Sequence, residues 1–245
     1  LPICWSAAFW RMQEFIAYDI TQACLDVRFP EHAIGWHWVN ILPAHNDLLA
    51  SFDVLQHKGY GVAVKAVDDA RVAGWAVERG GFGVWRTIRA GDCADTTLDP
   101  RVAAQLRLVA QGPYLPPVEA GIWIEPDNEC PRYFDDLAWL DAYTAELIRL
   151  FSERGYRVVF GTQGPGWWER EQVLALGDTW AAARQYHACL GYHAYATFPG
   201  VRVADSDIWR GYRHRLIHAW LVEAGYPDIP LCGTERSEEH TSELQ

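Results

Sequence analysis

The chain has 245 residues, of which 50% are hydrophobic and 22% charged, and its formal net charge is −11. These values allow one domain with a sizeable buried core. The acidic balance argues against a nucleic-acid-binding protein, which usually carries a basic face. No apolar run approaches the roughly 18 residues of a membrane span, so an integral membrane protein is not expected. The six cysteines form no C-x-x-C pair, so neither a zinc ribbon nor a dense disulfide framework is predicted.

Residues 1–30 do not follow the pattern of the rest of the chain. Within them, we expect Glu14–Leu25 to be a leading helix or the remnant of an upstream region. From residue 31 onward, short apolar, β-branched or aromatic runs recur, as is typical of strands covered on both faces of a parallel sheet. The seven predicted strands are Ala33–Asn40, Tyr60–Val67, Gly81–Ile88, Gly121–Glu125, Tyr156–Gly161, Leu190–Ala196 and Ile229–Thr234.

Helical patterns lie between most of these strands. Asp99 and Pro100 are typical of a helix N-cap followed by proline at the first helical position, and Gly112 is expected to end that helix. The clearest apolar stripe at helical spacing spans Asp135–Arg154. The other predicted helices are Asp47–His57, Trp167–Tyr186, Trp209–Ala224 and a short segment at Asp69–Arg79.

Alternating strands and helices predict βαβ units and an α/β fold. Seven units over residues 31–235 indicate a (β/α)8 TIM barrel that lacks its last strand and helix, since a complete one has about 250 residues. A doubly wound sheet is the alternative, but no G-x-G-x-x-G follows the first strand. An incomplete barrel would expose sheet edges at its first and seventh strands, and we expect it to aggregate.

The last ten residues, Arg236–Gln245, are polar and have no periodicity. They resemble the translation of a common sequencing-adapter read, and we interpret them as a foreign tail, with a genuine disordered tail as the alternative. On the first interpretation, the natural chain is expected to continue past Glu235.

Polar side chains gather where the predicted strands end, which is where barrel enzymes carry their active groups. Asn128 and Glu129 follow the fourth strand, and Glu235 ends the seventh. Those two strands lie on opposite sides of an eight-stranded barrel, so their ends can face each other across its mouth. Two carboxylates in such an arrangement can hydrolyse a glycosidic bond.

The order of these motifs resembles that of clan-A retaining glycoside hydrolases. The pattern is Asn-Glu after strand four, His193-x-Tyr195 on strand six and Thr-Glu at the end of strand seven. The runs Gly59–Lys65, Gly81–Arg86 and Pro230–Glu235 are also similar to glycosyl-hydrolase-like barrels of phage and environmental sequences. The resemblance covers about Trp36–Glu235.

The resemblance implies a role for each matching residue. Glu129 would be the general acid/base, Glu235 the nucleophile, and Asn128 would hydrogen-bond the sugar 2-hydroxyl. Arg86 or Lys65 would help to keep the nucleophile ionised. The further contacts expected with a carbohydrate substrate are Arg86, His193, Tyr195, Trp36, Trp85 and Lys65. No metal or other cofactor is expected.

Several alternatives stay open from the residues alone. Glu125 and Asp127 are further candidates for the acid, and Arg86 could pair with either of them instead of with substrate. Trp167 and Trp168 could form a substrate platform or a buried helix start. A barrel that binds carbohydrate without cleaving it, or a structural barrel, is the alternative to the enzyme.

Overall fold

A computed structural model describes residues 15–18, 33–39, 53–54, 56–57, 61–164, 167–193 and 213–235. For 15–18, 33–39, 61 and 235 it describes the backbone alone. The predicted tail at 236–245 lies outside the described residues.

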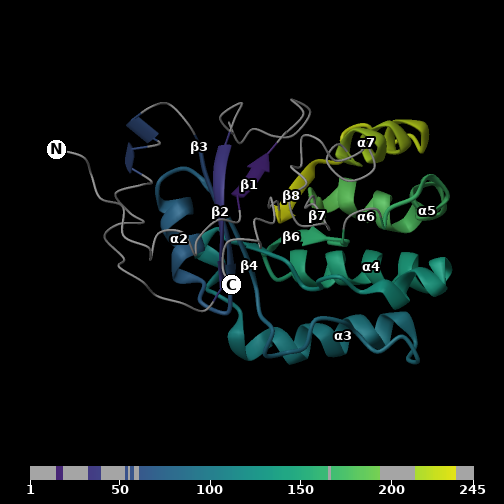
Figure 1. The fold of residues 1–245 in the computed structure, drawn as a ribbon. Coiled ribbons are helices and arrows are strands. Elements are labelled where there is room, and N and C mark those ends of the chain that lie inside the picture. The colour runs from purple at the N-terminus through teal and green to yellow at the C-terminus, as the bar shows by residue number, and fades with distance from the viewer. Residues whose placement is uncertain are drawn as a thin grey trace, which may run out of the picture.

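Eight strands form one sheet, in which the order of the strands follows the order of the chain (Figure 1). Six parallel pairings join β2 through β8, so consecutive strands are neighbours throughout. The curled parallel sheet is an incomplete (β/α)8 barrel, which confirms the predicted fold class. The strands are β1 Phe15–Tyr18, β2 Ala33–Val39, β3 Gly61–Val67, β4 Phe82–Arg86, β5 Trp123–Ile124, β6 Arg157–Phe160, β7 Cys189–His193 and β8 Leu231–Glu235.

The first of these strands corrects the prediction for the start of the chain. Phe15–Tyr18 forms β1 instead of part of a helix, and it pairs antiparallel with β2. β1 also lies against β8, as Figure 1 shows, so it stands between the two ends of the parallel sheet. The edge of β2 is therefore covered and not exposed as the sequence suggested.

Helices connect the strands and cover the outside of the sheet. They are α2 Arg71–Glu78, α3 Pro100–Gln111, α4 Leu137–Ser152, α5 Arg170–Ala175, α6 Gly177–Tyr186 and α7 Arg213–Glu223, with 3-10 turns η2 Gly112–Tyr114, η3 Val118–Ala120 and η4 Pro131–Asp135. Residues 53–54 and 56–57 are helical as well. None of the helices in the described ranges is long and apolar enough to cross a membrane.

Local capping explains where the helices begin. Asp99 accepts hydrogen bonds from the backbone of Arg101 and Val102, which confirms the predicted N-cap of α3. The expected single helix over Trp167–Tyr186 is two helices, because the backbone leaves helical geometry at Leu176. Asp141 of α4 accepts from the first amides of α6 and so supplies the cap for the new start.

Strand alternation divides the apolar residues into two layers. One layer fills the barrel interior with Ala63, Phe82, Val84, Trp123, Val159, Cys189 and Cys232. The other faces the helices and includes Ala66, Trp85, Ile124, Val158, Phe160, Leu190 and Leu231. Because successive side chains on a strand point to opposite faces, the interior set fixes which later residues also point inward.

Candidate active site

A polar layer lies above the apolar interior, toward the C-terminal ends of the strands. Lys65, Arg86 and Glu125 each follow an interior apolar residue by two positions, on β3, β4 and directly after β5. His193 follows Cys189 by four positions on β7. The period of two therefore directs all four side chains inward, where a barrel enzyme holds its site.

Lys65 and Glu125 form a fully buried ion pair at the base of this layer. The Lys65 Nζ lies 2.8 Å from Glu125 Oε2, and neither side chain has exposed surface. Burial alone would raise the pKa of Glu125, but the charges of Lys65, Arg86 and His193 outweigh it and hold the pKa below its ordinary value. A carboxyl group whose pKa is held below its ordinary value is a poor proton donor near neutral pH, which makes Glu125 a weak candidate for the acid.

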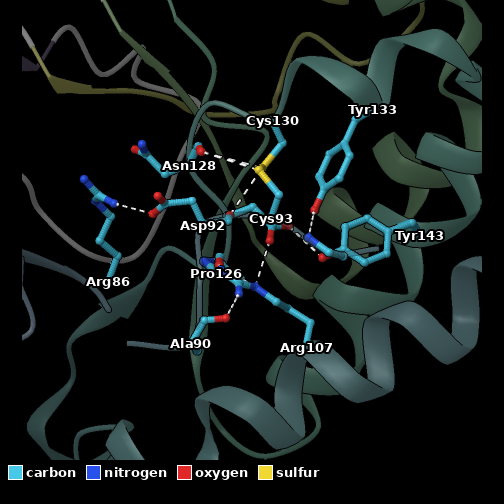
Figure 2. Close-up of a disulfide and its surroundings, with 12 residues drawn as sticks. Arg86, Ala90, Asp92, Cys93, Arg107, Pro126, Asn128, Cys130, Tyr133 and Tyr143 are labelled. Carbon is cyan, nitrogen blue, oxygen red and sulfur yellow. Dashed lines mark hydrogen bonds and ion pairs between the residues drawn. A yellow bond between two sulfur atoms is a disulfide. The ribbon is translucent and has the colours of Figure 1, made fainter. Parts of the chain in front are cut away.

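Asp127 faces the helices instead of the barrel interior, and it contacts both α3 and α4. Its carboxylate is 2.9 Å from Arg107 of α3 and accepts a hydrogen bond of 2.8 Å from Tyr143 of α4. Burial raises the pKa of Asp127, with Arg107 and the tyrosine hydroxyls acting in the other direction. Burial also keeps the pKa of Tyr143 well above its ordinary value, so this phenol remains a donor. Figure 2 shows Arg107 and Tyr143 beside the segment that follows β5, in which Pro126 and Asn128 are labelled.

Glu129 is the accessible carboxylate of the group after β5. Its side chain is 38% exposed, against 0% for Glu125 and 9% for Asp127. Glu129 Oε1 lies 2.7 Å from Nδ1 of His193, whose side chain is buried. The backbone of Glu129 is left-handed, with φ at 51°, and its amide donates to the Thr162 carbonyl after β6. The strand ends thus place Glu129 at the surface of the polar layer.

A disulfide between Cys93 and Cys130 ties the loop after β4 to the residue following Glu129 (Figure 2). In the same place, the amide of Asn128 donates to the Asp92 carbonyl, and the Asp92 carboxylate is 2.9 Å from Arg86. The Cys93–Cys130 disulfide was not predicted from the sequence. The signal was available, because both cysteines follow neighbouring parallel strands whose ends must lie close together.

The two tryptophans after β6 differ in exposure. Trp168 is buried, packs edge-on against Phe134, and donates through its indole to the Gly161 carbonyl. Trp167 is 41% exposed. A side chain at Gly164 would touch both the Trp167 indole and the Glu129 carboxylate, at 3.2 and 3.3 Å. Trp167 is therefore a neighbour of Glu129 at the surface.

Trp85 is a correction to the expected substrate contacts. It is fully buried in the layer between the sheet and the helices, and its indole donates to the Asp68 carbonyl. Strand alternation is the reason, since Trp85 stands between the inward-facing Val84 and Arg86. It belongs to the core and not to the site.

The structure brings together most of the other residues that the sequence singled out. Lys65 donates to Asn128 Oδ1 at 3.4 Å, and His193 contacts Glu129. The backbone of Glu235 is the register partner of His193, at an irregularity in the β7–β8 pairing. The side chains of Glu235 and Trp36 and all of Tyr195 lie outside the described residues. No metal-binding group of three or more His, Cys, Asp or Glu residues occurs in the described part.

No family model and no curated protein matches the chain. The solved structures that are weakly similar in shape include the following two. One is a protein of Bacillus subtilis assigned as a sporulation-specific glycosylase, with 10% identity, a TM-score of 0.29, and coverage of 84% of this chain and 65% of the other. The second is an HpcH/HpaI aldolase of Desulfitobacterium hafniense, with 12% identity, a TM-score of 0.30, and coverage of 83% and 85%. Similarity at this level identifies neither a family nor a reaction.

Proposed function

We propose that the chain is a retaining glycoside hydrolase with Glu129 as acid/base and Glu235 as nucleophile. The observation that carries the proposal is the hydrogen bond between Glu129 and His193, because His193 is also the register partner of Glu235. The buried His193 therefore contacts the side chain of Glu129 and is paired in the sheet with the backbone of Glu235. The ionised Glu125 and the helix-bound Asp127 leave Glu129 as the candidate acid among the carboxylates after β5.

In the first step, protonated Glu129 gives its proton to the glycosidic oxygen while the Glu235 carboxylate attacks the anomeric carbon. The bond from the anomeric carbon to oxygen breaks, the aglycone leaves as an alcohol, and a glycosyl ester forms on Glu235. In the second step, Glu129 takes a proton from water, and that water displaces Glu235. The two inversions release the sugar with its original anomeric configuration.

Neighbouring residues have supporting roles in this proposal. Lys65 has only donors, so its contact with Asn128 Oδ1 leaves the Asn128 amide nitrogen to donate to a sugar hydroxyl. Lys65 is itself buried beneath Asn128 and acts by orienting it rather than by touching the sugar. The exposed indole of Trp167 beside Glu129 offers an apolar face for a sugar ring.

Hydrolysis of a panel of aryl glycosides by the wild-type chain and three variants tests the proposal. Glu129→Gln and Glu235→Gln should each lower kcat/KM at least about a hundredfold. Glu129→Gln should lose less on dinitrophenyl glycosides, whose leaving group departs without protonation, whereas Glu235→Gln should lose equally on all substrates. Glu119→Gln is the matched control, because Glu119 is exposed and lies on η3, before β5.

Two results would overturn the assignment. Equal rates for the wild type and the Glu129→Gln or Glu235→Gln variant would remove that residue from the mechanism. Sugar binding by the folded chain, with no hydrolysis of any glycoside or polysaccharide offered, would favour a non-catalytic carbohydrate-binding barrel.

A further inference from the structure

The segment around Glu129 is attached to its surroundings at three successive residues. The Asn128 amide donates to the Asp92 carbonyl at 3.1 Å, and the Glu129 amide donates to the Thr162 carbonyl at 3.0 Å. Cys130 is then bonded to Cys93. Two of these three attachments lead to the loop between β4 and α3, and Figure 2 shows Asp92 and Cys93 of that loop beside Asn128 and Cys130.

Glu129 needs such attachments because its backbone is left-handed, with φ at 51°. A residue with a side chain is disfavoured in this region and remains there only when the surrounding structure holds it. The next residue along the chain carries the covalent attachment. The disulfide therefore acts directly on the backbone that aims the Glu129 carboxylate at His193.

We propose that the Cys93–Cys130 disulfide is a positioning clamp for Glu129, and that its reduction lowers the turnover of the enzyme. The inference rests on the proposed function, since it assigns the clamp to the acid/base of that reaction. Cys93 and Cys130 are positioning residues, because they act through the neighbouring Glu129 and not on substrate.

The clamp is open to a reductant from one side. Cys93 is exposed, whereas Cys130 is buried. A thiolate of a small dithiol would attack Cys93 Sγ, break the S–S bond and release Cys130 as a thiolate. The second thiol of the reagent would then release Cys93. The disulfide gains two electrons and two protons, and the dithiol leaves as its own cyclic disulfide.

The first test compares the wild-type chain, oxidised and dithiol-reduced, with a Cys93→Ala/Cys130→Ala double variant. Reduction and the double variant should each lower kcat/KM about a hundredfold on glycosides with poor leaving groups, as a displacement of about 1 Å can do. The loss should be much smaller on dinitrophenyl glycosides, which need no proton from Glu129. The reductant should leave the double variant unchanged, which assigns its effect to this disulfide.

The second test does not depend on activity. Hydrogen exchange at the Asn128 and Glu129 amides should quicken at least tenfold on reduction, while exchange in the middle of α4 should stay the same. Unchanged exchange at Asn128 and Glu129 would overturn the clamp, even if the chain hydrolyses no glycoside. An equal loss of rate on all leaving groups would overturn it too, because general destabilisation of the fold has no preference for the acid step. If the double variant does not fold, the reduced wild type still gives both readouts.

Discussion

At the residue scale, the interior of this barrel carries charge where an ordinary core carries hydrocarbon. Lys65 and Glu125 are both completely buried, and their ion pair of 2.8 Å supports Asn128 from below. A buried charge that loses its partner keeps the cost of its desolvation, so such pairs are far more sensitive to single substitutions than surface pairs.

Replacing Lys65 by methionine should therefore destabilise the fold strongly. The change leaves the Glu125 carboxylate buried without its cation, and we expect a loss of about 3–5 kcal/mol in the free energy of unfolding, measured by urea denaturation. Arg71→Met is the control, because the Arg71–Asp69 pair is exposed and its loss should leave the urea midpoint unchanged. Equal midpoints for the two variants would contradict the role of the buried pair.

The same pair predicts a dependence of stability on pH. The pKa of Glu125 is lowered in the folded chain, so its ionisation stabilises the fold above the unfolded pKa of about 4.3. That contribution should be lost as the pH falls through the lower, folded pKa. Urea midpoints from pH 7 to 3 should show the wild type above Glu125→Gln at neutral pH and the gap closing in acid. A difference in midpoint that widens in acid would mean that folding raises the pKa of Glu125, which would contradict the prediction.

At this scale, the sequence predicts which residues stand at the strand ends better than it predicts which side chains they contact. Lys65, Arg86, Asn128, Glu129 and His193 could be predicted because they stand at strand ends, which a barrel gathers at one rim. Trp85 was misassigned because a strand covered on both faces has no polar alternation, so nothing in its pattern distinguishes inside from outside.

At the element scale, close approach of a helix to the sheet depends on one glycine. A methyl group at Gly83 of β4 would stand 2.4 Å from the Ala73 carbonyl of α2. Backbone cannot yield as a flexible side chain does, so α2 sits against β4 only because no side chain intervenes. The spacing of apolar runs predicted the order of strands and helices along the chain. It could not predict this contact, which depends on how α2 packs against β4.

Gly83→Ala should accordingly push α2 away from the sheet and cost about 1–3 kcal/mol of unfolding free energy, as overpacked positions do. Gly112→Ala serves as the comparison, since its backbone is helical and nothing lies within 4 Å of the added carbon. Thermal melts of both variants measure the difference. A Gly83→Ala protein as stable as Gly112→Ala would show that α2 is not held by this contact.

Element boundaries were predicted well where the cap lies next to the helix in sequence, and poorly where it comes from elsewhere. Asp99 caps its own helix, α3, and the start of that helix was predicted correctly. The start of α6 depends on Asp141, a residue of α4 that no local pattern connects to it. The break between α5 and α6 could therefore not be predicted from the run Trp167–Tyr186.

At the scale of the whole molecule, the parallel sheet is incomplete, and β1 stands in the gap. β1 pairs antiparallel with β2 and lies against β8, so it covers an edge that would otherwise offer free backbone groups. β1 could not be predicted from the sequence, because its four residues carry too little periodicity to be recognised. With the β2 edge covered, we expect aggregation of a chain that lacks β1 rather than of the full chain.

Deleting residues 1–18 should uncover the edge of β2 and produce oligomers or aggregates, detectable by size-exclusion chromatography with light scattering. A deletion of residues 1–14 removes most of the same segment but retains β1, and it should behave like the full chain. Two deletions with the same elution and mass would contradict the protective role of β1.

The most direct test of the central claim is covalent trapping of the nucleophile. The reagent is a 2-deoxy-2-fluoroglycoside of a sugar that the chain hydrolyses, with a dinitrophenyl leaving group. Fluorine slows both steps, and the reactive leaving group speeds only the first, so the glycosyl ester should accumulate. Peptide mass spectrometry should locate that ester on Glu235 in the wild type and in Glu129→Gln. An ester on Glu129, or continued hydrolysis without any ester, would contradict the assignment of the two carboxylates.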